Sequence, residues 1–171
     1  FVAGTDVVKC GAKTATLFGY KRPEINNKYE GRSYLNIEKI RHPIIERIQT
    51  NTEYVTNDIK IDPDQNGTLL YGTNAAGKSS LMKAIGLNVI LAQAGFFVAA
   101  ETFKFYPYKY IFTRINNNDN IFKGESSFAV EMSELRSILK RSDNRSIILG
   151  DELCSGTESI SAQSIFAASV I

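Results

Sequence analysis

The stretch TLLYGTNAAGKSSLMKAIG, Thr68 to Gly86, decides how the rest of this sequence is interpreted. A short apolar run comes first, small residues ending in Gly-Lys-Ser follow, and residues with helical spacing come last. Small side chains pack poorly and cost entropy when they are ordered, so exposing the backbone here must bring a benefit. Gly72 to Ser79 fits the pattern G-x-x-x-x-G-K-[ST], between an expected strand and an expected helix, which is the context of a phosphate-binding loop.

The chemistry of this loop follows from its backbone. Consecutive N–H groups of small residues can point at phosphate oxygens, and the helix that begins near Lys78 adds the positive end of its dipole. Lys78 is expected to reach the β- and γ-phosphates, and the hydroxyl of Ser79 is expected to bind Mg²⁺. The expected nucleotide-binding residues of the loop are Gly72, Thr73, Asn74, Ala75, Ala76, Gly77, Lys78, Ser79 and Ser80. The complete motif and its flanks disfavour the alternative, a glycine-rich turn that binds nothing.

Two acids form the second candidate feature. Asp151 and Glu152 end the apolar run SIILG, where side chains emerge at the carboxyl edge of a sheet. We expect Asp151 to coordinate Mg²⁺ and Glu152 to orient the attacking water, so that Glu152 and Lys78 are the catalytic residues. The alternative is a solvated turn with two charges. Together with the loop, the acids indicate a nucleotide hydrolase without specifying the nucleotide.

The amino-acid composition of the chain is typical of a globular protein domain. The chain has 171 residues, of which 43% are hydrophobic and 22% charged, and its net charge is +2. That charge is too small to indicate nucleic acid or a membrane surface as a partner, and no apolar stretch is long enough to span a bilayer. Cys10 and Cys154 lack metal-site or disulfide spacing, which favours a reducing compartment. Because the sequence starts at Phe1 and stops at Ile171 within helical patterns, we expect a fragment of a longer protein.

Periodicity predicts alternating strands and helices. Helices are expected over 1–17, 78–94 and 126–141 and from 159 onward, and the segment 19–33 has the composition of a linker. Strands are expected over 34–40, 52–61, 68–71, 108–115 and the SIILG run. This order predicts an α/β fold, and the unbroken apolar run SIILG is typical of a buried parallel strand.

Three segments resemble a known family. GTNAAGKSS (72–80), IFTRINNNDNIFKGESSFAVEMSEL (111–135) and GDELCSGTES (150–159) together resemble the ATPase domain of the MutS family of DNA mismatch repair proteins. The resemblance covers nearly the whole chain, since FVAGTDVV (1–8) and RHPIIE (41–46) also resemble family segments. The form LGDELCSGTES is most similar to the branch found in large DNA viruses and some mitochondria.

The resemblance implies a fold and a function. Residues 1–19 would end a helical connecting segment. Residues 20–171 would form a partial, C-terminally truncated P-loop ATPase of the ABC type, with a mostly parallel central sheet flanked by helices. The implied activity is Mg²⁺-dependent ATP hydrolysis in a homodimer or paralogue dimer formed through the ATPase face, with closure around ATP controlling the binding of mismatched DNA. Double-stranded DNA would contact domains absent from this chain, no membrane is implied, and the isolated chain is expected to hydrolyse weakly.

The resemblance also carries individual roles. Asn74 matches an asparagine near the phosphates, and Ser126 matches a serine at the start of a helix that points at the γ-phosphate held by the other subunit. Tyr54 falls where the family has an aromatic residue stacked on adenine. An aromatic face suits ordinary strand packing equally well, so both interpretations of Tyr54 stay open. A serine at a helix start is also commonly an N-cap.

Some positions depart from the family pattern. Glu125 replaces a basic residue, and Cys154 stands where glycine is usual. Ala75 and Ala76 replace Met-Gly, and we expect binding to survive because alanine fits a tight loop when its φ is negative. The family's switch histidine would follow the end of this chain, and His42, in the RHP segment, is expected to be structural.

Two rival functions remain. An ABC-type ATPase of recombination or chromosome maintenance would share the nucleotide chemistry but lack the 111–135 block. A nucleotide-dependent dimerisation module without significant hydrolysis would not need the acids at 151 and 152. Mismatch recognition and suppression of recombination are not distinguished by these residues.

Overall fold

The computed structural model describes residues 1–26, 28, 31–48, 51–115, 127–151, 153 and 159–170. The chain divides into two compact units, Phe1–Pro107 and Tyr108–Ile171. None of the helices in this described part of the chain has the length and apolar character that crossing a bilayer requires.

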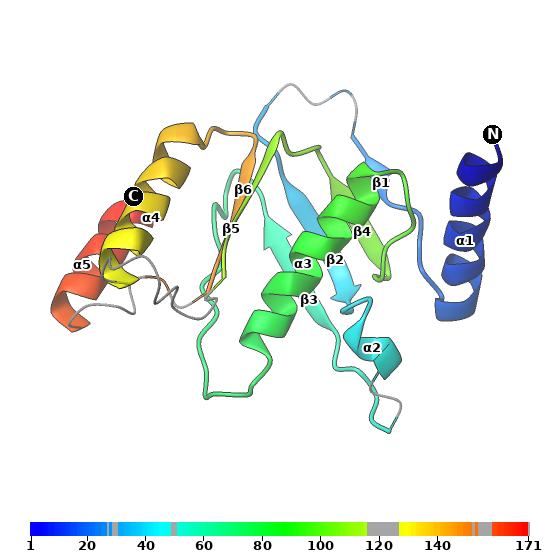
Figure 1. Ribbon diagram of the computed structural model, residues 1–171, viewed down its shortest axis with the longest axis horizontal. Helices are drawn as coiled ribbons and strands as arrows, with labels where there is room; N and C mark the ends of the chain where they lie inside the picture. The colour runs from blue at the N-terminus through cyan, green and yellow to red at the C-terminus, as the bar shows by residue number, and fades with distance from the viewer. Residues whose placement is uncertain are drawn as a thin grey trace. The chain divides into compact units, whose positions relative to one another are not determined.

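The first unit is built on a four-stranded sheet with strand order β1-β4-β2-β3 (Figure 1). The strands are β1 (Glu24–Ile25), β2 (Leu35–Ile40), β3 (Asn57–Ile61) and β4 (Thr102–Phe105). The central strand β2 is antiparallel to both β3 and β4, whereas β1 is parallel to β4. The sheet is therefore mixed. Alternation explains most of its buried face, since Leu35 and Ile37 in β2 and Phe103 and Phe105 in β4 point to one side. Ile40 is also buried although it lies three residues after Ile37, because the pairing of β2 with β3 shifts register between these two residues.

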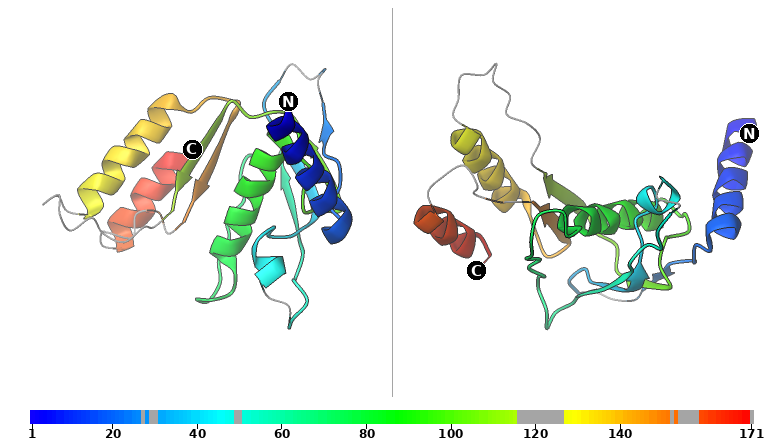
Figure 2. Two further views of the ribbon diagram at one scale, coloured as in Figure 1. Left: turned by 45° about the vertical axis from the view of Figure 1, so that its right-hand side comes forward. Right: turned by 90° about the horizontal axis from the view of Figure 1, so that it is seen from below.

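Helix α3 (Lys78–Gln93) lies against one face of this sheet (Figures 1 and 2). Its buried side includes Leu81, Ile85 and Val89, the positions that the sequence spacing assigned to the core. Helix α1 (Val2–Phe18) lies near the β1 edge and ends at Gly19, whose φ of 63° forms a left-handed cap. The short helix α2 (Ile45–Ile48) follows β2.

The second unit contains a parallel strand pair and two helices. Strand β5 (Tyr110–Arg114) pairs in register with β6 (Ser146–Gly150), so that Arg114 lies opposite Gly150. The helices are α4 (Ser127–Arg141) and α5 (Ser159–Val170). An ion pair of 2.9 Å between Arg114 Nε and Glu134 Oε2 joins β5 to α4.

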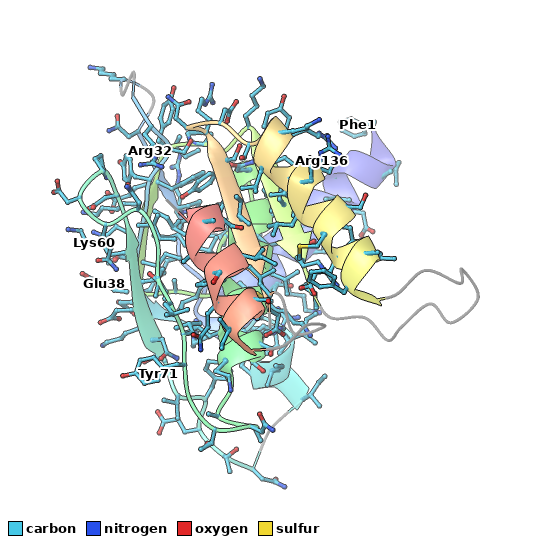
Figure 3. The ribbon with its side chains drawn as sticks, turned by 90° about the vertical axis from the view of Figure 1, so that its left-hand side faces the viewer. Phe1, Arg32, Glu38, Lys60, Tyr71 and Arg136 are labelled. Atoms are coloured by element: carbon cyan, nitrogen blue, oxygen red, sulfur yellow. The ribbon has the colours of Figure 1, made fainter. Side chains whose placement is uncertain are left out.

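Most expected elements are confirmed, and three differ. No strand forms at 68–71: this stretch pairs with no other described residues, and the Tyr71 side chain is 90% exposed (Figure 3). The expected linker over 19–33 contains β1, and the strand expected over 52–61 begins only at Asn57. The predicted α/β class is correct. The mostly parallel central sheet is not observed among the described strands: β1–β4 and β5–β6 are parallel pairs, but β2 is antiparallel to both of its neighbours.

Candidate nucleotide site

The glycine loop lies in the first unit, directly before α3. Its residues from Gly72 to Gly77 are exposed, and the N-cap of α3, Gly77, has a φ of 91°. Glycine suits this position because other residues rarely adopt the left-handed region. The first turn of α3 contains no acidic residue. An anion bound at the positive N-terminal end of this helix would therefore meet no repulsion from a carboxylate of that turn.

The loop presents a series of free backbone donors. The Ala76 amide donates to the Thr73 carbonyl oxygen at 3.3 Å. Six further amides have no acceptor among the described residues, namely those of Asn74, Ala75, Gly77, Lys78, Ser79 and Ser80. The Ser79 hydroxyl also makes no hydrogen bond within the described chain. Free N–H groups at a helix start are suited to phosphate oxygens.

The Lys78 ammonium spans the loop. Its Nζ donates to the carbonyl oxygens of Gly72 and Thr73, both at 2.8 Å. The side chain is therefore folded back over the residues that precede α3, with its positive charge at the carbonyl oxygens of Gly72 and Thr73. The structure brings together Lys78 and the loop backbone, whereas the contact of Lys78 with the β- and γ-phosphates stays a prediction.

The expected conformation of the loop needs one correction. Ala75 has a φ of +64°, whereas we expected alanine to be tolerated here through a negative φ. The left-handed region costs an L-residue about 1–2 kcal/mol, because Cβ approaches the carbonyl oxygen. Ala76, in contrast, is not among the residues with positive φ. The loop thus has local strain at one of the two alanines.

Tyr54 lines a cavity of about 500 Å³ in the first unit. The other lining residues are Arg41, Glu46, Asn51, Thr52, Glu53 and Thr56. Tyr54 precedes β3 rather than lying within a strand, and burial raises the pKa of its hydroxyl. The cavity therefore offers one aromatic ring among polar groups.

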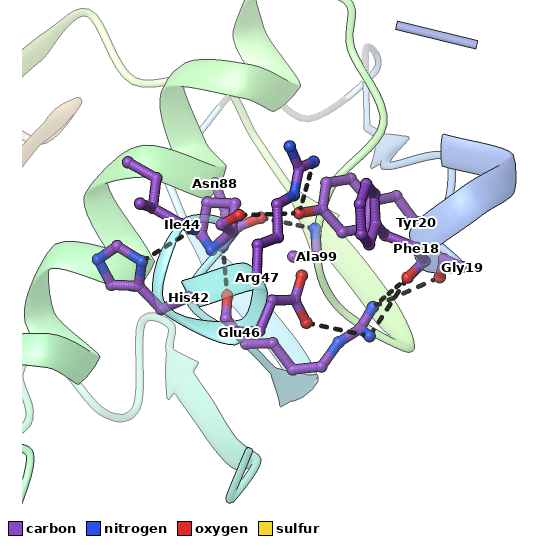
Figure 4. A network of polar contacts seen from close by, with 11 residues as sticks. Phe18, Gly19, Tyr20, His42, Ile44, Glu46, Arg47, Asn88 and Ala99 are labelled. Carbon is purple, nitrogen blue, oxygen red and sulfur yellow. Dashed lines mark hydrogen bonds and ion pairs between the residues drawn. The ribbon is translucent and has the colours of Figure 1, made fainter. Parts of the chain in front are cut away.

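A polar network joins this cavity to the end of α1 (Figure 4). Arg41 Nη1 lies 3.2 Å from Glu46 Oε2, and the same guanidinium donates to the carbonyl oxygen of Phe18. Arg47 lies over the Phe18 ring at 4.0 Å and donates to the Tyr20 hydroxyl at 3.2 Å. Burial, with a smaller contribution from Glu46, raises the pKa of Tyr20 to about 12.

His42 has the structural role that we expected. It is buried, and its Nδ1 accepts hydrogen bonds from the backbone amides of Ile44 and Ile45, both at 3.2 Å. Because Nδ1 must keep its lone pair for these bonds, the neutral ring is required. Desolvation lowers the pKa of His42, in agreement with this requirement.

Asn88 is a buried polar residue that sequence reasoning missed. Its Nδ2 donates to the carbonyl oxygens of Arg41 and Ala84, at 3.1 and 2.9 Å, and its Oδ1 accepts from the Ala99 amide at 2.7 Å. Asn88 thus ties α3 to the end of β2 and to the segment before β4. Only its position on the apolar face of α3, four residues after Ala84, could have signalled this role.

Asp151 lies in the second unit, directly after β6. Its amide donates to the Arg114 carbonyl oxygen at 2.8 Å, which places Asp151 at the carboxyl edge of the β5–β6 pair as expected. The glycine before it is exposed but lies close to one side chain, because a Cβ at Gly150 would lie 2.7 Å from Leu153 Cδ1. Glu152 and Ser126 lie outside the described residues, as do Glu125 and Cys154.

The described residues contain no group of three or more His, Cys, Asp or Glu side chains that could hold a metal ion by themselves. Mg²⁺ is usually held by one or two carboxylates together with substrate phosphates, rather than by a cage of protein ligands. The Ser79 hydroxyl in the first unit and the Asp151 carboxylate in the second unit are each hard oxygen donors, the ligand type that Mg²⁺ prefers.

The family described as MutS domain V matches residues 68–171. The chain belongs to the MutS family. Relatives of this MutS chain include a mitochondrial DNA mismatch repair protein mutS homolog of Sarcophyton glaucum, 40% identical over 99% of the chain. A putative DNA mismatch repair protein mutS homolog of Acanthamoeba polyphaga mimivirus is 37% identical over the whole chain, and the DNA mismatch repair protein MutS of Chlorobaculum tepidum is 42% identical over 96%. Viral and mitochondrial members are thus among its relatives, and the MutS chain spans only 17–18% of the length of these three proteins.

Proposed function

We propose that this chain is the ATP-binding and ATP-hydrolysing domain of a MutS-like DNA mismatch repair protein. The observation that carries the proposal is the set of free amides of Asn74, Ala75, Gly77, Lys78, Ser79 and Ser80 at the start of α3, together with a Lys78 ammonium that is folded back onto the loop carbonyls. This arrangement supplies many donors and a positive charge without a competing acid, as a triphosphate requires. Membership of the MutS family and relatives named as mismatch repair proteins support the same function.

Each side chain has a role in the proposed reaction. The loop amides bind the phosphates, and Lys78 exchanges its carbonyl acceptors for oxygens of the β- and γ-phosphates. Ser79 and Asp151 are the proposed Mg²⁺ ligands, and the ion would neutralise charge on the phosphates when bound. Glu152 orients the attacking water, Tyr54 stacks on the adenine, and Asn74 assists near the phosphates.

The wider mechanism extends this proposal to the intact protein. A homodimer or paralogue dimer would form through the ATPase face, with Ser126 of one subunit serving the nucleotide of the other. The fold class we propose for the intact domain is the ABC-type P-loop ATPase with a mostly parallel sheet. Closure on ATP would control the binding of mismatched DNA by other parts of the protein.

Two variants of the intact protein test the proposal. Lys78→Ala is expected to abolish ATP binding or turnover, whereas Lys83→Ala, which removes an exposed lysine from the same helix, is expected to leave both unchanged. Glu152→Gln is expected to keep binding and slow hydrolysis. Nucleotide binding by equilibrium dialysis and phosphate release in single-turnover assays separate the two steps.

The outcomes distinguish the assignments. Near-normal turnover in Lys78→Ala would remove the loop from the proposed site, and an unchanged single-turnover rate in Glu152→Gln would remove that acid. The shared dimer site also predicts that ATP turnover per subunit rises with protein concentration. Robust turnover that is independent of concentration in the 171-residue chain would contradict it.

A further inference from the structure

The Arg41 side chain contacts the C-terminal end of α1 and also lines the Tyr54 cavity, two features that are formed by separate parts of the sequence. Its Nη1 and Nη2 each lie 3.3 Å from the Phe18 carbonyl oxygen, and Nη2 lies 3.5 Å from that of Gly19. These carbonyls end α1, where a helix leaves acceptors without intrahelical partners. The same side chain lines the cavity that contains Tyr54. One guanidinium therefore caps a helix and borders a candidate binding site.

The backbone of Arg41 is held on both sides. Its amide donates to the Ala99 carbonyl oxygen at 2.8 Å, and its carbonyl oxygen accepts from Asn88 Nδ2 at 3.1 Å. Asn88 belongs to α3, the helix that starts at the glycine loop. With the backbone fixed, a ligand in the cavity can act on Arg41 only through the orientation of its side chain.

Glu46 determines what kind of ligand group suits Arg41. Because the Glu46 carboxylate lies 3.2 Å from Nη1, the charge of the guanidinium is already balanced. Because Nη1 faces Glu46 and the Phe18 carbonyl oxygen, and Nη2 faces the carbonyl oxygens of Phe18 and Gly19, Nε–H is the donor of this side chain that can serve a neutral acceptor, such as a ring nitrogen of a purine base. Tyr54 in the same cavity supplies an aromatic face for such a base.

We propose that Arg41 is a positioning residue that links occupancy of the Tyr54 cavity by a purine base to the capping of helix α1. The inference rests on the proposed function, because the base is that of the bound nucleotide. A base that accepts a hydrogen bond from Arg41 restricts the guanidinium to the orientation that also holds the carbonyls of Phe18 and Gly19. Linkage is reciprocal, so a weakened cap must in turn weaken nucleotide binding.

Hydrogen exchange tests the first direction. The amides of Gly19 and Tyr20 both donate to the Ala15 carbonyl oxygen and report on the cap. In the intact protein, magnesium with a non-hydrolysable ATP analogue is expected to slow their exchange about fivefold. Arg41→Gln is expected to remove this response. The control is Arg47→Gln, because Arg47 contacts the end of α1 but does not line the cavity, so this variant loosens the cap yet keeps the response.

Affinity measurements test the reverse direction without altering the cavity. Gly19→Ala strains the cap, since Gly19 has a φ of 63° and open space around its Cβ position. It is expected to weaken binding of the same analogue about fivefold, and to have no further effect in an Arg41→Gln background. Arg41→Lys, which keeps the charge but loses the fork, is expected to restore only part of the linkage.

Each outcome decides one claim. Binding of the analogue without slower exchange at Gly19 and Tyr20, or an equal response in Arg41→Gln, would overturn the linkage and leave the proposed function intact. Unchanged affinity in a folded Gly19→Ala variant would do the same. Failure of the wild-type protein to bind the analogue would overturn the proposed function, and the linkage with it.

Discussion

Replacement of Asn88 by leucine tests how the first unit is held together. Asn88 is fully buried and makes three hydrogen bonds, of which two satisfy backbone groups of other segments. Leucine fills similar space but leaves the Ala99 amide and the Arg41 carbonyl without their partner. A buried orphaned group costs about 1–3 kcal/mol, and the Arg41 carbonyl is only partly buried, so we expect a loss of about 2–4 kcal/mol.

Urea unfolding followed by circular dichroism measures this loss, and hydrogen exchange at the Ala99 amide reports on the same bond. Lys83→Leu is the matched control, since it introduces leucine at an exposed position of α3 and should change stability by less than about 0.5 kcal/mol. The reasoning is refuted if Asn88→Leu loses less than about 1 kcal/mol with an unchanged denaturant slope and an unchanged exchange rate at Ala99.

Three further predictions concern pH, loop strain and the edge of β6. Because the pKa of His42 is lowered in the folded state, its contribution to stability is present above pH 6.5 and is lost as the pH falls through the folded pKa; urea midpoints between pH 7.5 and 5 should therefore converge for the wild type and His42→Asn. Ala75→Gly should raise the free energy of unfolding by roughly 0.5–1 kcal/mol, since relief of the left-handed strain exceeds the entropic cost of glycine, and a lower urea midpoint would contradict this. Gly150→Ala should displace Leu153 and with it Asp151, slowing single-turnover hydrolysis about tenfold to a hundredfold while nucleotide binding changes less, and Leu153→Ala should partly rescue the rate.

The spacing of apolar residues was sufficient to predict those helices and strands whose own sequences carry a clear periodic or apolar pattern. The spacing of Leu81, Ile85 and Val89 identified α3 and its buried face, and the apolar run before Asp151 identified a parallel strand. Strand β4 was missed although Phe103 and Phe105 alternate with polar residues, which is a readable signal. The two-residue strand β1 depends on backbone pairing with β4 and has no pattern of its own.

Features that depend on distant partners were not predictable in the same way. The apolar run at 68–71 has strand composition, but a strand also needs a neighbour, and none of the described residues provides one. Residue types identified the glycine loop and Lys78, whereas the left-handed φ of Ala75 comes from the backbone path. The network of Arg41, Glu46 and Asn88 joins positions far apart in the chain, so no spacing rule reveals it.

The two carbonyl contacts of Lys78 bear on how tightly the loop can hold a nucleotide. A lysine side chain has about 2 kcal/mol of rotamer entropy, and here the four-carbon stem is already anchored at its far end. An arriving phosphate therefore finds an ordered ammonium and has only to replace two neutral oxygens with charged ones. The contribution of Lys78 to affinity is therefore the difference in strength between its bonds to phosphate oxygens and its bonds to the carbonyl oxygens of Gly72 and Thr73. A cationic side chain of another length would not be anchored on these two carbonyls in the same way and would be a poor substitute.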